Sequence, residues 1–285
     1  MINTAARKNW TLLPALALAF ALHLIVAEPG QAAPVKLEGQ LVQGGVVFGS
    51  SEPGARITLN ERNVRVSDAG RFVFGFGRDA PSEAHLVVVL PDGTREERVL
   101  NIEARQYKIQ RIEGLPPKMV TPPESVLARI RAEGEVIAAA RAVDRPEPLF
   151  ETGFIWPTVG PISGVFGSQR ILNGEPRRPH YGIDIAVPAG TPVRAPADGV
   201  VAIAEPDLYF TGGTVLLDHG HGLTSVYSHL KDVTVESGQR LRQGDVLGTV
   251  GSTGRATGAH LDWRINWFTE RLDPAFFVPP MPAAQ

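Results

Sequence analysis

The sequence predicts a mostly β protein in which two β-rich parts flank a helical linker. Short runs that alternate apolar and polar residues recur along the chain, for example V-K-L-E-G-Q-L-V at 35–42 and H-L-D-W-R-I-N-W at 260–267. This alternation is typical of half-buried strands. The 30 glycines and 24 prolines supply many turns between such runs. One segment, from Glu124 to about Val143, instead has apolar residues at helical spacing.

The composition is that of an ordinary globular protein, and it excludes several kinds of site. The 285 residues are enough for two domains. The formal net charge is −2, so no basic field indicates a nucleic-acid partner. The chain has no cysteine, which excludes disulfides, thiolate metal sites, a cysteine nucleophile and a lipidated cysteine.

Residues 1–32 are predicted to be an export signal. Arg7 and Lys8 precede an apolar run at 11–27, and small residues follow that run. We expect cleavage after Ala32, no stable membrane insertion of the mature protein, and a location in the periplasm or cell envelope. An uncleaved membrane anchor is the alternative. The run is at the short end of the roughly 17–25 residues that a membrane span needs.

Residues 33–112 are predicted to form a small β-sandwich. Turn signals such as E-P-G, D-A-G and P-D-G separate short apolar runs such as R-F-V-F-G-F and H-L-V-V-V-L. Short strands at this spacing are typical of sandwiches. His85 opens one apolar run, where a lone histidine is usually structural. We therefore expect a spacer or a binding module without its own chemistry.

Residues 113–150 are predicted to be a linker that contains one helix. A group of prolines marks its start, and the helix is expected from Glu124 to about Val143. Gly134 interrupts the helical pattern. The predicted apolar stripe consists of Val126, Leu127, Ile130, Ile137 and Ala138.

Residues 151–285 are predicted to form the second β-rich domain. Its strand-like runs include G-I-D-I-A-V, T-V-L-L-D-H and L-T-S-V-Y-S-H-L. The two histidines of D-H-G-H at 218–221 could form a metal pair, but we interpret this glycine-rich segment as the tip of a hairpin. The segment I-L-N-G-E-P-R-R-P is predicted to be a solvated loop. Arginines in and next to it, Arg170, Arg177 and Arg178, could contact peptide carboxylates at a rim.

Five residues in this second part have the chemistry of a hydrolytic metal site. His180 and Asp184 form an H-x-x-x-D motif, and His260 and Asp262 lie two residues apart in a strand-like run, so that they face one side. A hydrolytic zinc site needs three nitrogen or oxygen ligands and an open position for water. We interpret His180, Asp184 and Asp262 as the ligands. His229 and His260 remain as catalytic residues that handle protons and stabilise an oxyanion.

The order of these motifs resembles that of the LytM-type (lysostaphin-like, M23) zinc metallopeptidase family. The resemblance covers roughly 155–278. It implies an antiparallel β-sheet groove with one zinc ion at its floor, and hydrolysis of peptide bonds in peptidoglycan stems or cross-links. The segments that carry it are F-G at 166–167, H-Y-G-I-D-I at 180–185, P-A-G-T-P-V-R-A-P-A-D-G-V-V at 188–201, Y-S-H-L at 227–230, G-Q-R-L-R-Q-G-D-V-L-G-T-V-G-S-T-G at 238–254 and G-A-H-L-D at 258–262.

Carried over by motif, the resemblance assigns His180 and Asp184 as the first two zinc ligands. It also assigns His229 as the histidine of the family's Y-x-H-L segment and His260 as the first histidine of its H-x-H motif. The sequence departs from the family at Asp262, where a second histidine is expected as the third ligand.

The residue at position 262 changes the charge of the predicted site. A carboxylate is an acceptable zinc ligand, but two carboxylates neutralise the dication. This should weaken its Lewis acidity and favour harder ions such as Mn²⁺. Alternatively, Asp262 pairs with a nearby arginine such as Arg264 and holds no metal.

Two functions follow from this reading of the sequence. The first is an exported metalloendopeptidase that hydrolyses peptidoglycan peptides with metal-activated water. The alternative is a non-catalytic LytM-like module that binds cell wall or activates another wall hydrolase.

Overall fold

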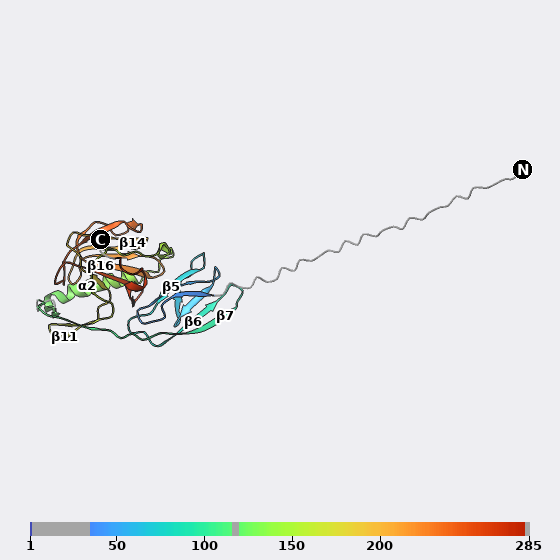
Figure 1. Ribbon diagram of the computed structural model, residues 1–285, viewed down its shortest axis with the longest axis horizontal. Coiled ribbons are helices and arrows are strands. Elements are labelled where there is room, and N and C mark those ends of the chain that lie inside the picture. The colour runs from blue at the N-terminus through green and yellow to red at the C-terminus, as the bar shows by residue number, and fades with distance from the viewer. Residues whose placement is uncertain (2–34, 116–119, 283–285) are drawn as a thin grey trace. The chain divides into compact units, whose positions relative to one another are not determined.

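The computed structural model describes residue 1 and residues 35–115 and 120–282. Residues 33–285 form one compact unit. The predicted mostly β class is confirmed, since strands, nearly all in antiparallel pairs, are far more abundant than helices in this unit (Figure 1). The predicted signal sequence lies outside the described residues except for Met1. Within the described ranges, no helix has the length and apolarity needed to cross a membrane.

The N-terminal strands form two small sheets, as expected for a sandwich. One has the order β1-β2-β5 and the other the order β4-β3-β6-β7. Alternate residues of β6 are buried, including Ala84, Leu86 and Val88, so this sheet has one face in the core. The strands are β1 (Lys36–Gly39), β2 (Val46–Ser50), β3 (Arg56–Leu59), β4 (Arg62–Val64), β5 (Arg71–Gly75), β6 (Glu83–Val89) and β7 (Arg95–Asn101).

A ten-stranded sheet dominates the C-terminal part and carries the candidate site. Seven of its strands follow the order β17-β14-β15-β16-β19-β12-β9. Three more strands pair outside this order: β18 with β16, β13 with β18, and β20 with β19. The strands are β9 (Ile162–Gly164), β12 (Ile183–Ile185), β13 (Pro192–Arg194), β14 (Gly199–Leu208), β15 (Gly212–Asp218), β16 (Leu223–Val233), β17 (Arg240–Leu241), β18 (Val246–Val250), β19 (Leu261–Trp267) and β20 (Glu270–Leu272).

A fourth sheet, of three strands, joins the end of the N-terminal part to the C-terminal part. Strand β8 (Ile109–Ile112) pairs in parallel with β10 (Gln169–Leu172), which pairs with β11 (Glu175–Pro176). The expectation of a solvated loop at 171–179 was therefore wrong where these strands form. Asn173 and Gly174 both have positive φ, 49° and 82°, and they close a tight turn between the two strands.

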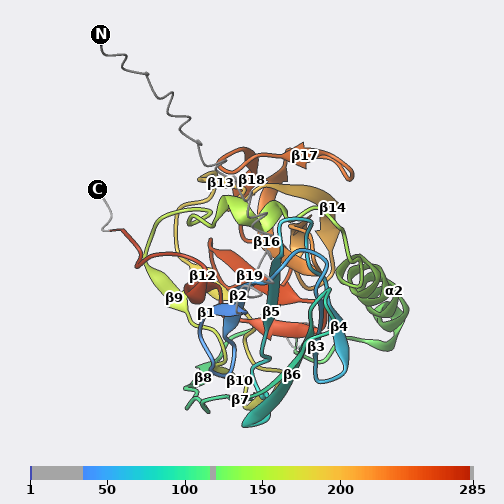
Figure 2. The ribbon, with the colours of Figure 1, turned by 90° about the vertical axis from the view of Figure 1, so that its right-hand side faces the viewer.

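The predicted linker helix is confirmed as α2 (Glu124–Arg141). Ile137 and Ala140 pack on a cluster of Ile203, Leu216 and Val226, and α2 lies beside β14 and β16 in Figures 1 and 2. No residue of α2 is fully buried, so the helix covers the sheet without entering its core. The described residues also form two 3₁₀ helices, η1 (Leu149–Thr152) and η2 (Pro274–Phe276).

The N-terminal module contacts segments next to the large sheet through an ion pair and aromatic rings. Arg105 lies 2.9 Å from Asp273. The ring of Phe48 lies 6.0 Å from the rings of Phe150 and Phe277. The boundaries of the domains at 112 and 150 remain predictions, because these contacts tie the parts into one unit.

Candidate metal centre

The pairing of three neighbouring strands places the candidate ligands. In the β12–β19 pair Asp184 lies opposite Asp262, and in the β16–β19 pair Asp262 lies opposite Ser228. Residues that lie directly opposite in an antiparallel pair have Cβ atoms about 4.5–5.5 Å apart. The strand register therefore brings two carboxylates together that are far apart in the sequence.

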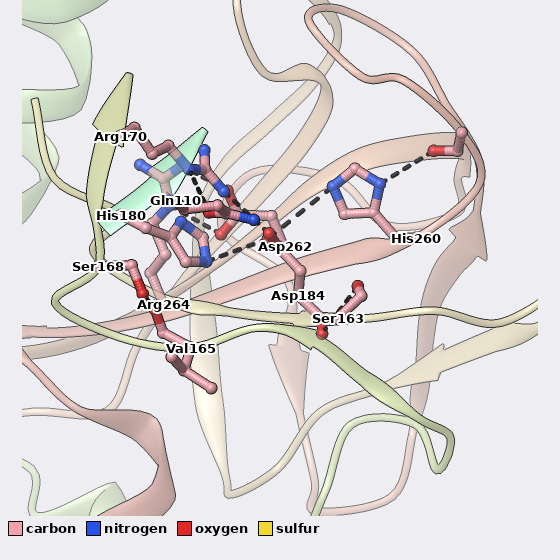
Figure 3. Close-up of polar contacts among 11 residues, drawn as sticks. Gln110, Ser163, Val165, Ser168, Arg170, His180, Asp184, His260, Asp262 and Arg264 are labelled. Carbon is pink, nitrogen blue, oxygen red and sulfur yellow. Dashed lines mark hydrogen bonds and ion pairs between the residues drawn. The ribbon is translucent and has the colours of Figure 1, made fainter. Parts of the chain in front are cut away.

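The third candidate ligand, His180, precedes β12 and is fixed by its backbone. Its N–H donates to the carbonyl of Ser168, and its carbonyl accepts from Gly167 N–H, both at 2.8 Å. Its ring Nε2 lies 3.1 Å from Asp184 Oδ1. One donor atom from each of His180, Asp184 and Asp262 lies within 4.8 Å of the others, and all three side chains are buried. Figure 3 shows Asp184 between His180 and His260.

Two glycines leave the space that the carboxylates occupy. A Cβ on Gly164 would lie 2.2 Å from Asp184 Oδ2. A Cβ on Gly182, the central residue of the H-x-x-x-D motif, would lie 2.7 Å from Asp262 Oδ1 and 2.5 Å from the carbonyl oxygen of Trp263. Only glycine fits at these positions without displacing a candidate ligand.

Each carboxylate also has an arginine partner. Arg170 Nη2 donates to Asp184 Oδ2 at 2.8 Å. Arg264 Nε donates to Asp262 Oδ1 at 2.8 Å, and its Nη2 contacts Asp262 Oδ2. The alternative predicted for Asp262, an ion pair with Arg264, is thus present in the structure. It does not by itself exclude ligation, because each carboxylate oxygen has two lone pairs.

The arginines keep both carboxylates ionised. Burial alone would raise the pKa of Asp262, but Arg264 outweighs burial and the pKa lies well below its usual value. Burial would likewise raise the pKa of Asp184, and His180 and Arg170 overcome this effect and lower it. Ionised carboxylates are the form that binds a cation.

Unpartnered buried atoms show that the residues fit a metal ion. His180 Nε2 and Asp184 Oδ1 are buried, and apart from their contact with each other neither has a hydrogen-bond partner. Buried polar atoms normally have partners, so such a pair needs an explanation. Ligands at ~2.0–2.1 Å from a tetrahedral zinc ion lie about 3.3 Å apart, which is close to the 3.1 Å between these two atoms. Both atoms would be satisfied by one cation.

The two other histidines line the same pocket and share one tautomer. His229 Nδ1 lies 2.7 Å from the carbonyl oxygen of Thr253, and His260 Nδ1 lies 2.9 Å from that of Gly258. A carbonyl oxygen only accepts, so each Nδ1 carries the proton and donates. In a neutral ring this leaves a lone pair on Nε2. The ring centroids are 4.8 Å apart, and His260 Nε2 lies 3.8 Å from Asp184 Oδ1.

An irregular backbone conformation places His229 in the pocket. Side chains of a regular strand point alternately to its two faces. Ser228 of β16 lies opposite Asp262, so a regular β16 would point the next side chain, His229, to the other face. His229 has φ 66°, in the left-handed region, and its N–H donates to the carbonyl of Thr211 at 2.7 Å. This local break in the strand lets His229 line the pocket together with Asp184 and His260. Burial lowers the pKa of His229 to about 4.

The remaining histidine pair lies elsewhere, as predicted. Asp218 ends β15 and Leu223 begins β16, so His219 and His221 occupy the hairpin tip. His219 is buried, with Nδ1 2.7 Å from the carbonyl oxygen of Asp198 and Nε2 2.7 Å from Ser225 Oγ. These contacts are structural.

The structure adds residues to the site that sequence patterns did not identify. The pocket next to the candidate ligands has a volume of about 270 Å³, and Gln110, Ile112, Arg170 and Arg255 line part of it. Arg170 was expected in a loop at the rim of the site. It lies instead on β10, which pairs with β8, and contacts Asp184. No sequence motif indicates this pairing. Arg264 could be anticipated, because residues two apart in a strand share a face.

Comparisons with known proteins agree with this fold. A family model described as Peptidase family M23 matches residues 178–274. A solved structure from Pseudomonas aeruginosa, assigned to peptidase M23, shares 32% sequence identity and has a TM-score of 0.66. The match covers 84% of this chain and 95% of that one.

Two curated relatives match over shorter stretches. Cell division protein DipM of Caulobacter vibrioides is 31% identical over 169 residues, which is 56% of this chain and 26% of DipM. DD-carboxypeptidase/endopeptidase Mpg of Neisseria meningitidis is 40% identical over 121 residues, which is 42% of this chain and 28% of Mpg. The chain thus spans about a quarter of the length of these relatives. Together with the solved structure that it matches almost throughout, they show that the chain belongs to peptidase family M23.

Proposed function

We propose that this protein is an exported metalloendopeptidase that hydrolyses peptide bonds in peptidoglycan. The observation that carries the proposal is the convergence of His180, Asp184 and Asp262 next to a pocket that His229 and His260 also line. The names of relatives support the substrate class: Mpg is a DD-carboxypeptidase/endopeptidase, and ShyA of Vibrio cholerae, 38% identical over 102 residues, is a peptidoglycan DD-endopeptidase.

His180, Asp184 and Asp262 would hold one divalent ion. When bound, zinc would act as a Lewis acid and supply hydroxide at neutral pH. Two carboxylates and one imidazole also suit a harder ion such as Mn²⁺. Arg170 and Arg264 fix the orientation of the two carboxylates, which is the role that outer hydrogen bonds commonly have at metal sites.

His229 is the proposed general base. Because burial lowers its pKa to about 4, its ring is neutral at neutral pH, and the bond from Nδ1 to Thr253 leaves Nε2 as the acceptor. His229 Nε2 takes a proton from the attacking water and returns it to the leaving amine. His260, which lines the same pocket, is the proposed residue that stabilises the developing oxyanion.

Replacement of His180 tests the proposal directly. The mature protein should release peptide fragments from purified peptidoglycan, and a chelator should stop the release. His180→Ala should lose both bound metal, by elemental analysis, and cleavage. His85→Ala is the matched control, because His85 is exposed on β6 in the N-terminal module. Cleavage by His180→Ala at the parent rate would refute the assignment.

A second function is favoured by one specific observation, the ion pair between Asp262 and Arg264. Arg264 uses both oxygens of Asp262, and two arginines balance the two carboxylates without any metal. A non-catalytic module that binds cell wall or activates another wall hydrolase would have this charge balance. Such a protein would contain no metal after purification and would not cleave peptidoglycan with any added divalent ion.

The double variant Asp262→His with Arg264→Gln separates the two functions. It restores an imidazole as third ligand and removes the arginine that would otherwise be left unpaired. Gain of cleavage from an inactive parent would show that the native site is non-catalytic. A parent that already cleaves, with a chelator-sensitive rate, supports the endopeptidase.

A further inference from the structure

We infer that the C-terminal end of α2, together with β19 and β20, forms a binding site for a phosphate group. Its cationic residues are Arg141, Arg264 and Arg271, called the arginine cluster below. The inference does not depend on the proposed hydrolysis of peptidoglycan. It assigns a second ligand to the protein and a task to the linker helix.

Strand register places two members of the arginine cluster on the same face of the large sheet. Arg264 lies opposite Val226 in the β16–β19 pair, and Arg271 lies opposite Asn266 in the β19–β20 pair. Arg264 and Asn266 are two residues apart on β19, so they share a face. Arg271 Nη1 donates to Asn266 Oδ1 at 2.6 Å. The guanidinium of Arg271 therefore lies on the face that carries Arg264.

The linker helix covers this face and brings the third arginine to it. Ala140 of α2 packs on a cluster of apolar side chains that includes Val226, the residue opposite Arg264. Arg141 follows Ala140 directly and is the last residue of α2. Burial, then Arg271 and Arg264, lower the pKa of Arg141 to about 8. Cations act on each other in this way when they are neighbours, which agrees with the placement by packing and register.

Arg141 differs from the two sheet arginines because its buried nitrogen lacks a partner. Arg264 donates to Asp262, and Arg271 donates to Asn266. Arg141 is half-buried, and its Nε is buried without a hydrogen-bond partner among residues 35–115 and 120–282. Buried N–H groups normally have acceptors, and a buried charge is costly unless an opposite charge pairs with it. An anion next to Arg141 would supply both.

The charge balance favours an anion with more than one negative charge. The three guanidinium groups of the arginine cluster share one ion-paired carboxylate, that of Asp262. Glu270 also acts on Arg271, but less than Arg264 does. A single carboxylate would therefore leave part of the positive charge uncompensated. A phosphate group carries close to two negative charges at neutral pH and has several acceptor oxygens.

The side chains of the arginine cluster also have the geometry that phosphate requires. A planar guanidinium fork donates two parallel hydrogen bonds to phosphate oxygens. The ring of Tyr181 borders the cluster, since the guanidinium of Arg271 lies 5.5 Å from its centre. A guanidinium beside an aromatic ring is restrained in its orientation. We therefore expect inorganic phosphate or a small phosphomonoester as the ligand.

A bound phosphate would fasten the linker helix to the sheet. Arg141 comes from α2, whereas Arg264 and Arg271 come from β19 and β20. Oxygen atoms of one phosphate that accept from both sides would bridge the two elements. Because α2 has no fully buried residue, such a bridge would add to a contact that otherwise depends on partly buried side chains. Binding should stabilise the folded protein by mass action and slow amide exchange in the last turn of α2.

The test measures binding of inorganic phosphate to the purified protein by calorimetry. The protein is treated with a chelator, so that no metal ion binds the phosphate, and is kept in chloride buffer at neutral pH. The parent protein should bind one phosphate saturably. Arg141→Gln should bind it about tenfold more weakly or worse, the size expected for lost hydrogen bonds to a charged group. The matched control, Arg131→Gln, removes an exposed arginine of the same helix and should bind phosphate like the parent.

Urea unfolding with and without phosphate separates a ligand site from a structural role. Without phosphate, Arg141→Gln should be at least as stable as the parent, because it removes a cation that lacks a counter-charge. Phosphate should stabilise the parent and Arg131→Gln but not Arg141→Gln. A parent protein that gains no stability from phosphate, together with a destabilised Arg141→Gln, would make Arg141 a structural residue and overturn the inference.

The calorimetric outcomes are equally decisive. Absence of saturable phosphate binding by the parent overturns the inference. Binding that Arg141→Gln leaves unchanged also overturns it, because the phosphate then lies elsewhere on the protein. If Arg141→Gln does not fold by circular dichroism, Arg271→Gln decides instead by the same tenfold criterion.

Discussion

Arg264 donates to both carboxylate oxygens of Asp262, so the third candidate metal ligand, itself buried, is also half of an ion pair with a half-buried arginine. The two residues lie two apart on β19 and face the same side of the sheet. On the neighbouring strand β12, Asp184 also has an arginine partner, Arg170 of β10, which contacts one of its oxygens. The site therefore consists of two carboxylates, each oriented by an arginine, and one imidazole.

Loss of the carboxylate at position 262 should destabilise the metal-free protein. Asp262→Asn leaves the guanidinium of Arg264, whose side chain is 23% exposed, without its charged partner. Breaking a fully buried pair from one side costs about 3–5 kcal/mol, and this partly exposed pair should cost somewhat less. Urea unfolding measures this loss, and the double variant Asp262→Leu with Arg264→Met should lose less. Glu147→Gln, which breaks an exposed pair with Arg240, should cost about 1 kcal/mol or less. A similarly small cost for Asp262→Asn would contradict a buried pair.

Replacement of His229 should slow the chemistry without removing the metal. A positioned general base contributes typically about 10²–10⁴-fold to the rate, so His229→Ala should lower kcat on a soluble peptide substrate by that order. Its metal content should equal that of the parent protein, since the ring lies outside the set His180, Asp184 and Asp262. Turnover at the parent rate would rule out His229 as the base.

A methyl group at position 182 should weaken metal binding. In Gly182→Ala the new Cβ would lie 2.7 Å from Asp262 Oδ1, so the carboxylate must move. Displacement of groups around a metal site typically costs about 10–100-fold in affinity, which competition with a chromophoric chelator measures. The control is Gly134→Ala in α2, where a Cβ meets nothing within 4 Å. Equal affinity in the two variants would show that the site tolerates the shift.

Stability should fall on acidification below about pH 6.5 because of buried neutral histidines. Burial lowers the pKa of His219, so the unfolded chain binds a proton near pH 6.5 that the folded chain does not. The stability is fully present above that pH and is lost as the pH falls toward the lowered pKa of the folded state, by up to about 1.4 kcal/mol per pH unit for one group.

The variant His219→Gln isolates this contribution. His221 and His229 have lowered pKa values as well, so they also make the folded protein less stable as the pH falls. The variant should therefore reduce the slope of the unfolding free energy against pH by the amount that corresponds to about one proton, and part of the slope should remain. Urea unfolding at several values between pH 7.5 and 5 provides the slope, with the exposed His85→Gln as control. An unchanged slope would show that His219 is protonated in the folded protein.

The sequence by itself determined the local elements and the identity of the chemical groups. Runs of alternating apolar and polar residues predicted strands, and the apolar stripe predicted the helix at 124–141. The glycine-rich D-H-G-H segment predicted the tip of the β15–β16 hairpin. These features follow from interactions between residues close in the chain. The motifs also named the five groups that the fold then brings near one another: His180, Asp184 and Asp262 as a cluster, and His229 and His260 in the pocket that Asp184 also lines.

Only the tertiary structure decided which of these groups meet and what surrounds them. The register of β12 against β19 sets Asp184 opposite Asp262, and the parallel pairing of β8 with β10 brings Gln110 next to Arg170. The left-handed conformation of His229 turns its ring toward the pocket against the alternation of β16. Each of these depends on contacts between segments distant in the chain, whose pairing and spacing no local pattern encodes.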